Sequence, residues 1–345
     1  MIRRIPKPPS WLPLDPYVLA LIGTVVLAAI LPASGTGARV AGGASTGAIS
    51  FLFFLYGARL STAEALDGLR HWRLHLTVLL CTFAVFPLLG LAARGLVPHV
   101  LTPELYGGLL FLCLVPSTIQ SSIAFTSIAR GNVPAAICAG SFSSLAGIFL
   151  TPLLAAALLG GDGGGFSADA LLRIAVQLLL PFVAGQLLRR WIGGFVARHK
   201  KVLGYVDRGS ILLVVYTAFS EGMIEGVWHR ITPARLGVLL GVEALLLAAM
   251  LALTWYGAKR LGFGREDRIA IQFAGSKKSL ASGLPMASVL FGAQASLAVL
   301  PLMLFHQMQL MVCAVIAKRR SRDVTEDIAE RPAGGAAPRE AAAVG

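Results

Sequence analysis

The sequence predicts an all-α integral membrane protein with ten transmembrane helices in two inverted five-helix repeats. Three observations lead to this fold class. Of the 345 residues, 56% are hydrophobic and only 14% are charged, whereas soluble domains carry roughly 25% charged residues. Ten apolar stretches follow one another, each near the length of about 20 residues that a helix needs to cross a bilayer. Two of them, one in each half of the chain, are interrupted by polar residues at the same place.

The first apolar stretch, residues 17–33, has two interpretations. It follows Arg3, Arg4 and Lys7 and ends near Pro32-Ala33-Ser34, which is the order of a secretory signal peptide that is later removed. The alternative is an uncleaved first span. We favour the span, because two equal halves of five spans need it.

The same length rule places the other nine spans roughly at residues 44–60, 74–96, 105–130, 133–159, 169–190, 207–227, 234–258, 266–291 and 293–317. The two repeats are then residues 17–160 and 169–317. A repeat with an odd number of spans must insert upside down when it is duplicated in tandem, which is typical of secondary transporters. Residues 318–345 form a tail whose Ala-, Gly-, Pro- and Glu-rich composition predicts disorder.

Lysine and arginine residues predict the orientation of the chain. Counted as far as Arg322, the side that holds both termini carries 21 of them, and the opposite loops carry 5. Positive loops stay in the cytoplasm, so we expect a multi-pass protein of the cell inner membrane with both termini cytoplasmic. The net charge of +13 is explained by these short loops. Nucleic acid is not an expected partner, because its recognition needs a soluble basic face with aromatic residues.

Reactive side chains form no pattern that predicts catalysis. The four cysteines lie in apolar stretches without CxxC spacing, and the six histidines are scattered, so neither a disulfide framework nor a metal site is expected. Paired intramembrane carboxylates or a Ser/His arrangement, which an enzyme would need, are not visible. We therefore do not expect an enzyme. The sequence leaves the oligomeric state open.

The fourth span is broken at Pro116, which is followed by Ser117-Thr118-Ile119-Gln120-Ser121-Ser122. Proline lacks an N–H and frees carbonyl groups. Freed carbonyls and hydroxyls are the oxygen ligands that small cations prefer. The alternative is a proline kink whose carbonyls are satisfied by neighbouring hydroxyls, or small residues that allow close helix packing. The density of polar residues favours a substrate or ion site that includes Gln120, Ser121 and Ser122.

The ninth span is broken around Lys277 and Lys278, followed by Ser279. Lys277 lies roughly 16 Å along this span, near the midplane of a 30 Å hydrocarbon core. A charge there is costly unless it faces a cavity or a partner. A later start of the span is the alternative, but Ser279–Phe291 is too short to cross alone. The ammonium groups can hold an anionic substrate or stand where a coupling cation would bind. The residues expected to break the two helices are Pro116, Gly275, Gly283 and Pro285.

Two further residues are weaker site candidates. Glu243 lies about ten residues into the eighth span and can pair with Lys277 or Lys278; the alternative is a lumen-facing carboxylate without a role. His306 in the tenth span shares a helical face with Gln309 and can line the cavity. Ordinary hydrogen bonding between helices is the alternative for His306.

The run from Pro116 to Pro134, Pro-Ser-Thr-Ile-Gln-Ser-Ser-Ile-Ala-Phe-Thr-Ser-Ile-Ala-Arg-Gly-Asn-Val-Pro, and the run from Gly275 to Pro285 resemble the bile acid:sodium symporter (SBF-like) superfamily. Within it, the solute carrier family 10 member 7-like branch is the most similar. The resemblance covers about residues 15–320. It implies a panel domain of spans 1, 2, 6 and 7 and a core domain of spans 3–5 and 8–10. Broken spans 4 and 9 would then cross at the midplane, with substrate bound between the domains.

The resemblance also implies sodium ions beside that crossing, so sodium is the one cofactor candidate. The family's Ser-Asn sodium ligands match Ser121 and Ser122. The other ligand positions hold residues that do not supply the family's sodium ligands: Ala136, Gly140, Phe273 and Lys277. Sodium coupling is therefore in doubt, since an ammonium occupies the place of a ligand.

The expected function is secondary active transport of a small organic, anionic solute by alternating access, with the lipid bilayer as the surrounding medium. The alternative is a non-transporting membrane regulator of ion homeostasis or envelope assembly that acts through partners. Labelling of a cysteine at Ser121 from both sides of the membrane would separate the two.

Overall fold

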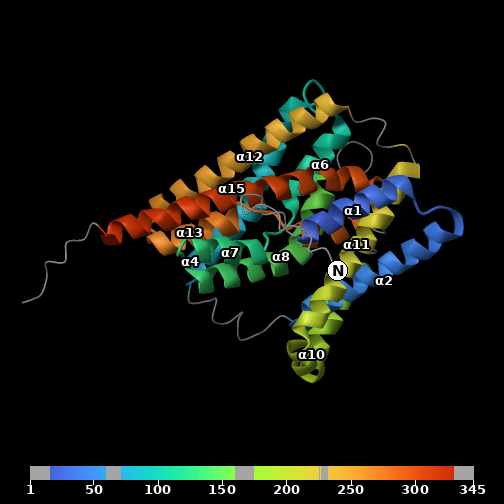
Figure 1. Cartoon of the computed structure of the whole chain (residues 1–345), viewed down its shortest axis with the longest axis horizontal. Coiled ribbons are helices and arrows are strands. Elements are labelled where there is room, and N and C mark those ends of the chain that lie inside the picture. Colours follow the sequence, from blue (N-terminus) through green and yellow to red (C-terminus); the bar gives the residue numbers. More distant parts are fainter. Residues whose placement is uncertain (1–15, 60–70, 160–174, 225, 227–231, 330–345) are drawn as a thin grey trace, which may run out of the picture.

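The computed structural model describes residues 16–59, 71–159, 175–224, 226 and 232–329, and all regular structure in these ranges is helical (Figure 1). The first half contains α1 (Pro16–Ile30), α2 (Gly35–Arg59), α4 (Trp72–Leu80), η2 (Cys81–Val85), α5 (Phe86–Ala92), η3 (Ala93–Leu96), α6 (Pro103–Leu114), α7 (Gln120–Ile128) and α8 (Val133–Leu159). The second half contains η4 (Ala175–Leu179), α10 (Leu180–Arg198), α11 (Lys200–Ile224), α12 (Pro233–Arg260), α13 (Arg265–Gly275), α14 (Leu280–Phe291), η6 (Gly292–Gln294) and α15 (Ala295–Ala329).

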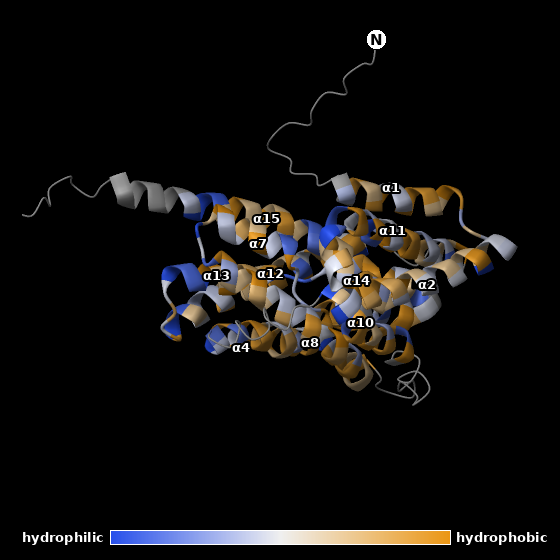
Figure 2. Cartoon of the chain, turned by 90° about the horizontal axis from the view of Figure 1, so that it is seen from below, coloured by the Kyte–Doolittle hydropathy of each residue, from blue (hydrophilic) through white to orange (hydrophobic). Residues whose placement is uncertain are grey.

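Six helical stretches of the described chain are long and apolar enough to cross a membrane: Gly35–Arg59, Trp72–Leu96, Val133–Leu159, Lys200–Ile224, Pro233–Arg260 and Ala295–Ser321. Large apolar side chains such as Leu187 and Leu245 are about 70% exposed on the outside of the bundle, which suits contact with lipid rather than water. Hydrophilic residues gather around the start of α13 (Figure 2). The chain is therefore a multi-pass membrane protein.

Several helix boundaries differ from those predicted. Helix α8 covers the predicted residues 133–159, but α2 begins at Gly35 rather than at residue 44. The difference arises because Gly35, Gly37 and Gly43 look like a loop in the sequence, while the structure keeps them helical. Helix α15 continues to Ala329, past the predicted end at residue 317. Residues 1–15 and 330–345 lie outside the described chain.

The helices form two groups. Helices α1, α2, α10 and α11 pack on one another at one side of the molecule, and α4 to α8 pack with α12 to α15 at the other (Figure 1). In the second group α6 lies along α15, α4 along α8, and α12 along α13. Helix α11 also packs against α14 and α15 and so connects the two groups.

Helices α2 and α10 approach each other unusually closely at two glycines. A Cβ added to Gly57 would lie 2.0 Å from the carbonyl oxygen of Phe182, and one added to Gly185 would lie 2.0 Å from that of Phe54. Only glycine allows backbones to come this near. The reciprocal pair makes α2 and α10 a firmly joined unit on one side of the cavity described below.

Candidate functional site

The two predicted breaks are real interruptions of helices, and they touch each other. The first lies between α6 and α7, and the second between α13 and α14. The N–H of Ser279 donates to the carbonyl of Pro116 at 2.8 Å, so backbone from one break pairs with backbone from the other. The hydroxyl of Ser117 donates to the carbonyl of Ala274 at 2.5 Å. Unwound backbone is tolerated at such depth because the protein itself satisfies it.

Three carbonyls at the end of α6 accept from donors outside their own helix. The hydroxyl of Thr151 on α8 donates to Leu114 O at 2.8 Å. Cys113 O and Val115 O each accept from the ammonium of Lys278 at 2.8 Å. The loss of helical hydrogen bonds at the break is therefore offset by bonds from α8 and from the second break.

The ammonium group of Lys278 is fully buried and fully hydrogen-bonded. Besides Cys113 O and Val115 O, it donates to Thr82 O at 2.9 Å. Its Nζ also lies 4.1 Å from the centre of the Phe86 ring, within the range of a cation–π interaction. Three carbonyls match the three donors that an ammonium has. Lys278 thus joins the third apolar stretch to both breaks.

Lys277 is equally buried but is held differently. Its Nζ donates to Ser121 Oγ at 3.1 Å and lies 4.5 Å and 5.7 Å from the ring centres of Phe125 and Phe273. One of its three donors has a hydrogen-bond acceptor in the described protein. Lys277 therefore keeps capacity for a further acceptor, whereas Lys278 does not.

Gln309 is a site residue that the sequence reasoning passed over in favour of His306. Its Oε1 accepts from the N–H of Lys278 at 2.8 Å, and its Nε2 donates to the carbonyl of the same residue at 2.8 Å. The Nδ1 of His306 lies 3.4 Å from Lys278 O and 2.9 Å from Gln309 Nε2. His306 is thus a neighbour of the break and is not among the residues that line the cavity. The shared helical face was the available signal, and it pointed to both residues.

The sequence analysis also missed two hydroxyl residues, Ser143 and Thr151, because they lie in a different span from the break that they contact. The hydroxyl of Ser143 on α8 accepts from the N–H of Ser117 at 2.9 Å, and Thr151 binds Leu114 as described. Small residues complete this contact, because a Cβ on Gly147 would lie 2.7 Å from the Pro116 ring. Sequence spacing gives no sign that α8 faces the first break.

The hydroxyls of the two predicted sodium ligands already make hydrogen bonds in this conformation. Ser121 Oγ already accepts from the Lys277 ammonium. Ser122 Oγ lies 2.6 Å from Thr118 O and 3.0 Å from Phe273 O, and donates to these carbonyls. A cation at Ser121 Oγ would compete with the Lys277 ammonium for the same oxygen. Among the described residues, no group of three or more His, Cys, Asp or Glu side chains is placed to hold a metal.

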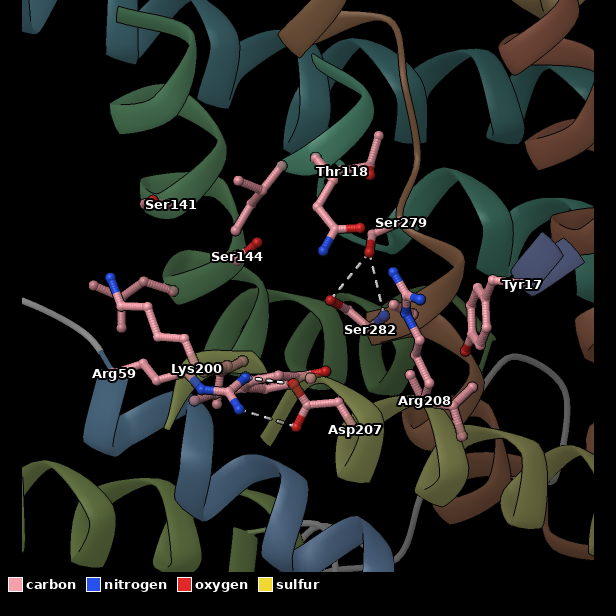
Figure 3. A pocket seen from close by; sticks show the side chains of 18 of the residues that line it. Tyr17, Arg59, Thr118, Ser141, Ser144, Lys200, Asp207, Arg208, Ser279 and Ser282 are labelled. Atoms are coloured by element: carbon pink, nitrogen blue, oxygen red, sulfur yellow. Dashed lines mark hydrogen bonds and ion pairs between the residues drawn. The ribbon is translucent and has the colours of Figure 1, made fainter. Parts of the chain in front are cut away.

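A cavity of about 620 Å³ lies beside the crossing, between the two helix groups (Figure 3). Residues of α1, α2, α10 and α11 line one side of it, and residues of α7, α8 and α14 line the other. Of the predicted site residues, Gln120 and Ser279 line this cavity. Ser121, Ser122, Lys277 and Lys278 are not among its lining residues and form the layer behind it.

The cavity carries an excess of positive charge. Its lining includes four basic residues, Arg59, Lys200, Lys201 and Arg208, and one acidic residue, Asp207. Arg59 and Asp207 form an ion pair between α2 and α11. Arg208 points toward Ser279 and Ser282 (Figure 3), and its guanidinium carbon lies 5.7 Å from the centre of the Tyr17 ring. Basic groups beside hydroxyls and aromatic rings suit an organic anion.

Three predictions about individual residues are corrected. Glu243 on α12 is fully buried, but within the described residues both its carboxyl oxygens lack a hydrogen-bond partner, and neither lysine pairs with it. The lysines are instead held by Ser121 and by main-chain carbonyls. Gly283 and Pro285 lie within α14 rather than in the break. Pro285 lies inside α14, where its missing N–H removes one helical hydrogen bond without ending the helix. Gly283 makes room for Leu302, whose Cδ2 would lie 2.3 Å from an added Cβ.

The turn after α7 contacts the start of α13, which is the first part of the second broken helix. Arg130 has a left-handed backbone with φ of 55°. Asn132 then caps α8 by accepting from Ala135 N–H at 3.0 Å, and its Nδ2 donates to Asp267 Oδ1 at 2.8 Å. A Cβ on Gly131 would lie 2.5 Å from a methyl of Ile269. The Ile128–Asn132 run is therefore a structural joint between α7, α8 and α13.

Comparison with known proteins supports this interpretation. The model of the SBF-like CPA transporter family matches residues 15–322. An uncharacterized protein of Pseudomonas aeruginosa is 56% identical over 94% of this chain and 98% of its own length. YfeH of Escherichia coli (strain K12), named as a candidate symporter, is 48% identical over 91% and 95%. Sodium/bile acid cotransporter 7-B of Xenopus laevis is 29% identical over 78% and 80%. The resemblance seen in the sequence is confirmed: the chain belongs to the SBF-like CPA transporter family, in the cotransporter 7 branch of the bile acid:sodium symporter superfamily, and it is a membrane transporter rather than an enzyme.

Proposed function

We propose that this protein moves a small organic anion across the cell inner membrane by secondary active transport with alternating access. The observation that carries this proposal is the cavity of about 620 Å³ between the two helix groups, with four basic residues in its lining. Positive lining lowers the energy of a desolvated anion. Ser279 and Ser282 at the start of α14 supply hydroxyls that can orient it.

The proposed architecture is ten spans in two inverted five-span repeats, residues 17–160 and 169–317, with a panel of α1, α2, α10 and α11. Helix pairings support it, because several contacts recur between equivalent helices. The α1–α11 contact corresponds to α10–α2, the α4–α8 contact to α12–α15, and the α7–α8 contact to α14–α15. Both breaks fall in the fourth span of their repeat. An internal pseudo-two-fold relation of this kind is what inverted repeats produce.

Two pairings of α11 depart from this symmetry, and the departure supports an inward-open conformation. Helix α11 packs against α14 and α15. Its counterpart α2 faces α7 and α8 across the cavity, as Tyr56 and Arg59 on one side and Ser144 on the other indicate. Lys200 and Lys201 line the cavity at the start of α11, beside the connection from α10 that the positive-inside rule places in the cytoplasm together with both termini. In the outward-open state, α2 would pack against α7 and α8, and a cavity would separate α11 from α14 and α15.

Uptake by proteoliposomes tests the proposal. Purified protein is reconstituted and supplied with labelled organic anions, and with neutral and cationic molecules of similar size. We expect anions alone to enter faster than into empty liposomes. Arg208→Gln should raise the half-saturating anion concentration about tenfold, since a hydrogen bond to a charged group is worth about 1.5–3 kcal/mol. Uptake that is identical for all three classes of solute would contradict the proposal.

Arg190→Gln is the matched control for Arg208→Gln. Arg190 lies on the adjoining helix α10, stacks on Trp191 at 3.6 Å and is not a lining residue of the cavity. Its loss should leave the half-saturating concentration unchanged. Lys277→Ala tests the layer behind the cavity, and uptake equal to wild type in that variant would remove Lys277 from the transport mechanism.

A further inference from the structure

We propose that the Lys278 ammonium is a built-in cation that permanently fills a site made of main-chain carbonyls, so that the helix crossing takes no sodium ion during transport. The transport part of this inference rests on the function proposed above, but the carbonyl site itself does not. The site consists of Thr82 O, Cys113 O and Val115 O, all within 2.9 Å of Lys278 Nζ.

The first carbonyl of the site is freed by a π-helical turn followed by a proline. The N–H of Phe86 donates to Cys81 O, five residues back. The next donor in this pattern would be the N–H of residue 87, which would serve Thr82 O. Residue 87 is proline and has no N–H. Thr82 O is therefore available to the ammonium.

The other two carbonyls are freed by the first helix break. In a continuous helix Cys113 O would accept from the N–H of Ser117, but that N–H donates to Ser143 Oγ instead. Val115 has an extended backbone with ψ of 155°, so its carbonyl leaves the direction of the helix. Three separate irregularities thus direct three carbonyls at one point.

The chemistry of this point suits a monovalent cation. Its partners in the described chain are carbonyl oxygens and the face of the Phe86 ring, not carboxylates. Rings of carbonyl dipoles stabilise monovalent cations without adding a formal negative charge, and an aromatic face adds to this attraction. The ammonium uses every donor that it has, and Gln309 fixes the peptide of the same residue from both sides.

A sodium ion at the crossing would have to enter beside two lysine side chains. The neighbouring Lys277 already donates to Ser121 Oγ. Like charges a few Å apart repel strongly in a medium of low dielectric constant. A third cation is therefore excluded while Lys278 remains in its site. The two lysines differ in this respect, because Lys278 is saturated with acceptors while Lys277 has donors to spare.

The first test measures the melting temperature of the purified wild-type protein in sodium, potassium and choline chloride at equal ionic strength. We expect agreement to about 1 °C, because a ligand that binds only the folded state would raise the melting temperature. A saturable stabilisation that sodium alone produces would overturn the proposal.

The second test empties the site. Lys278→Ala should lower the melting temperature by roughly 5–10 °C, since three buried carbonyls lose their donors. n-Propylammonium, which replaces the missing chain and charge, should restore much of this loss, whereas n-propanol should not. Lys277→Ala is the matched control and should show neither the full loss nor the rescue. Lys278→Met keeps an unbranched chain as far as the ε position and removes the ammonium. A wild-type melting temperature for this variant, or a Lys278→Ala protein indifferent to propylammonium, would overturn the proposal.

The third test separates this inference from the proposed function. Uptake of a transported anion into proteoliposomes should be equal in sodium and in potassium gradients. Uptake that only a sodium gradient drives would refute the absence of sodium at the crossing. If no solute is transported at all, the proposed function fails, while the two melting experiments still decide whether Lys278 fills a cation site.

Discussion

The side-chain amide of Gln309 binds both polar groups of the Lys278 peptide, accepting from its N–H and donating to its carbonyl, each at 2.8 Å. Gln309 lies on α15, while Lys278 lies in the unwound segment between α13 and α14. The amide therefore takes the place of the two helical hydrogen bonds that the break removes. A buried peptide without such a partner would be costly.

Gln309→Leu should destabilise the protein by about 2–4 kcal/mol, because it leaves a buried N–H and a buried carbonyl without partners. Chemical denaturation of the purified protein measures this change. Gln307→Leu on the same helix is the control, since the Oε1 of Gln307 is buried and accepts no hydrogen bond from the part of the chain that the structure describes. Its replacement should cost little. Equal losses for the two variants would show that Gln309 acts by packing alone.

Ser143 and its neighbour Ser144 offer a second matched pair. The hydroxyl of Ser143 accepts the N–H of Ser117 in the first break at 2.9 Å, and Ser144 lines the cavity. Ser143→Ala should lower the free energy of unfolding by about 1–3 kcal/mol, because the buried N–H loses its acceptor. Ser144→Ala should be nearly neutral for stability. Thermal unfolding of both variants checks the prediction, and it fails if Ser144→Ala is the more damaging change.

The sequence predicted the positions of both breaks because a proline followed by hydroxyl groups, and two lysines inside an apolar stretch, are chemically conspicuous. The sequence analysis also predicted that Ser121 and Lys277 belong to the same site, and in the structure these two side chains are in contact. The partners on unbroken helices were missed. Ser143, Thr151 and Gln309 are ordinary polar residues in apolar helices, and only the packing of α8 and α15 on the breaks shows their use.

The cavity residues were harder still to predict from the sequence. In the sequence, Arg59, Lys200 and Arg208 look like cytoplasmic loop charges that fix the topology. They also contribute to the excess of positive charge on the cytoplasmic side. Their place in a cavity depends on how α2 and α11 lie relative to α7 and α14. No periodic pattern in the sequence indicates this packing. Glu243 failed as a predicted partner for a similar reason, since depth in the membrane does not give the direction of a side chain.

Gly57→Ala should separate α2 from α10. The added Cβ would lie 2.0 Å from Phe182 O, a main-chain atom that cannot move without the helix. Overpacking of this kind costs about 1–3 kcal/mol or more. Gly47→Ala on the same helix meets nothing within 4 Å and should be neutral or stabilising by up to about 1 kcal/mol. Melting temperatures in detergent compare the two, and a stable Gly57→Ala protein would contradict the close approach.

Glu243→Leu should stabilise the protein. The carboxyl group is fully buried, and neither of its oxygens has a hydrogen-bond partner among the described residues, so its removal relieves a desolvation cost of about 1 kcal/mol or more. Glu243→Gln is the control, because it keeps an unpaired polar group at the same place and should bring no such gain. A clear loss of stability in the leucine variant would show that the carboxyl group is needed for folding.

Alternating access predicts that a cavity residue can be reached from both sides of the membrane at different times. Ser282 lines the cavity at the start of α14, so a Ser282→Cys protein should react with a membrane-impermeant thiol reagent from the cytoplasmic side in the conformation described here. Reaction from the opposite side should appear once the transporter cycles, and a transported anion should change the ratio of the two rates. Ser296 is fully buried, so Ser296→Cys should react from neither side, and the wild-type protein gives the background of the native cysteines. Labelling of Ser282→Cys from one side only, with or without transported anion, would contradict alternating access and favour a membrane protein that acts through partners without transport.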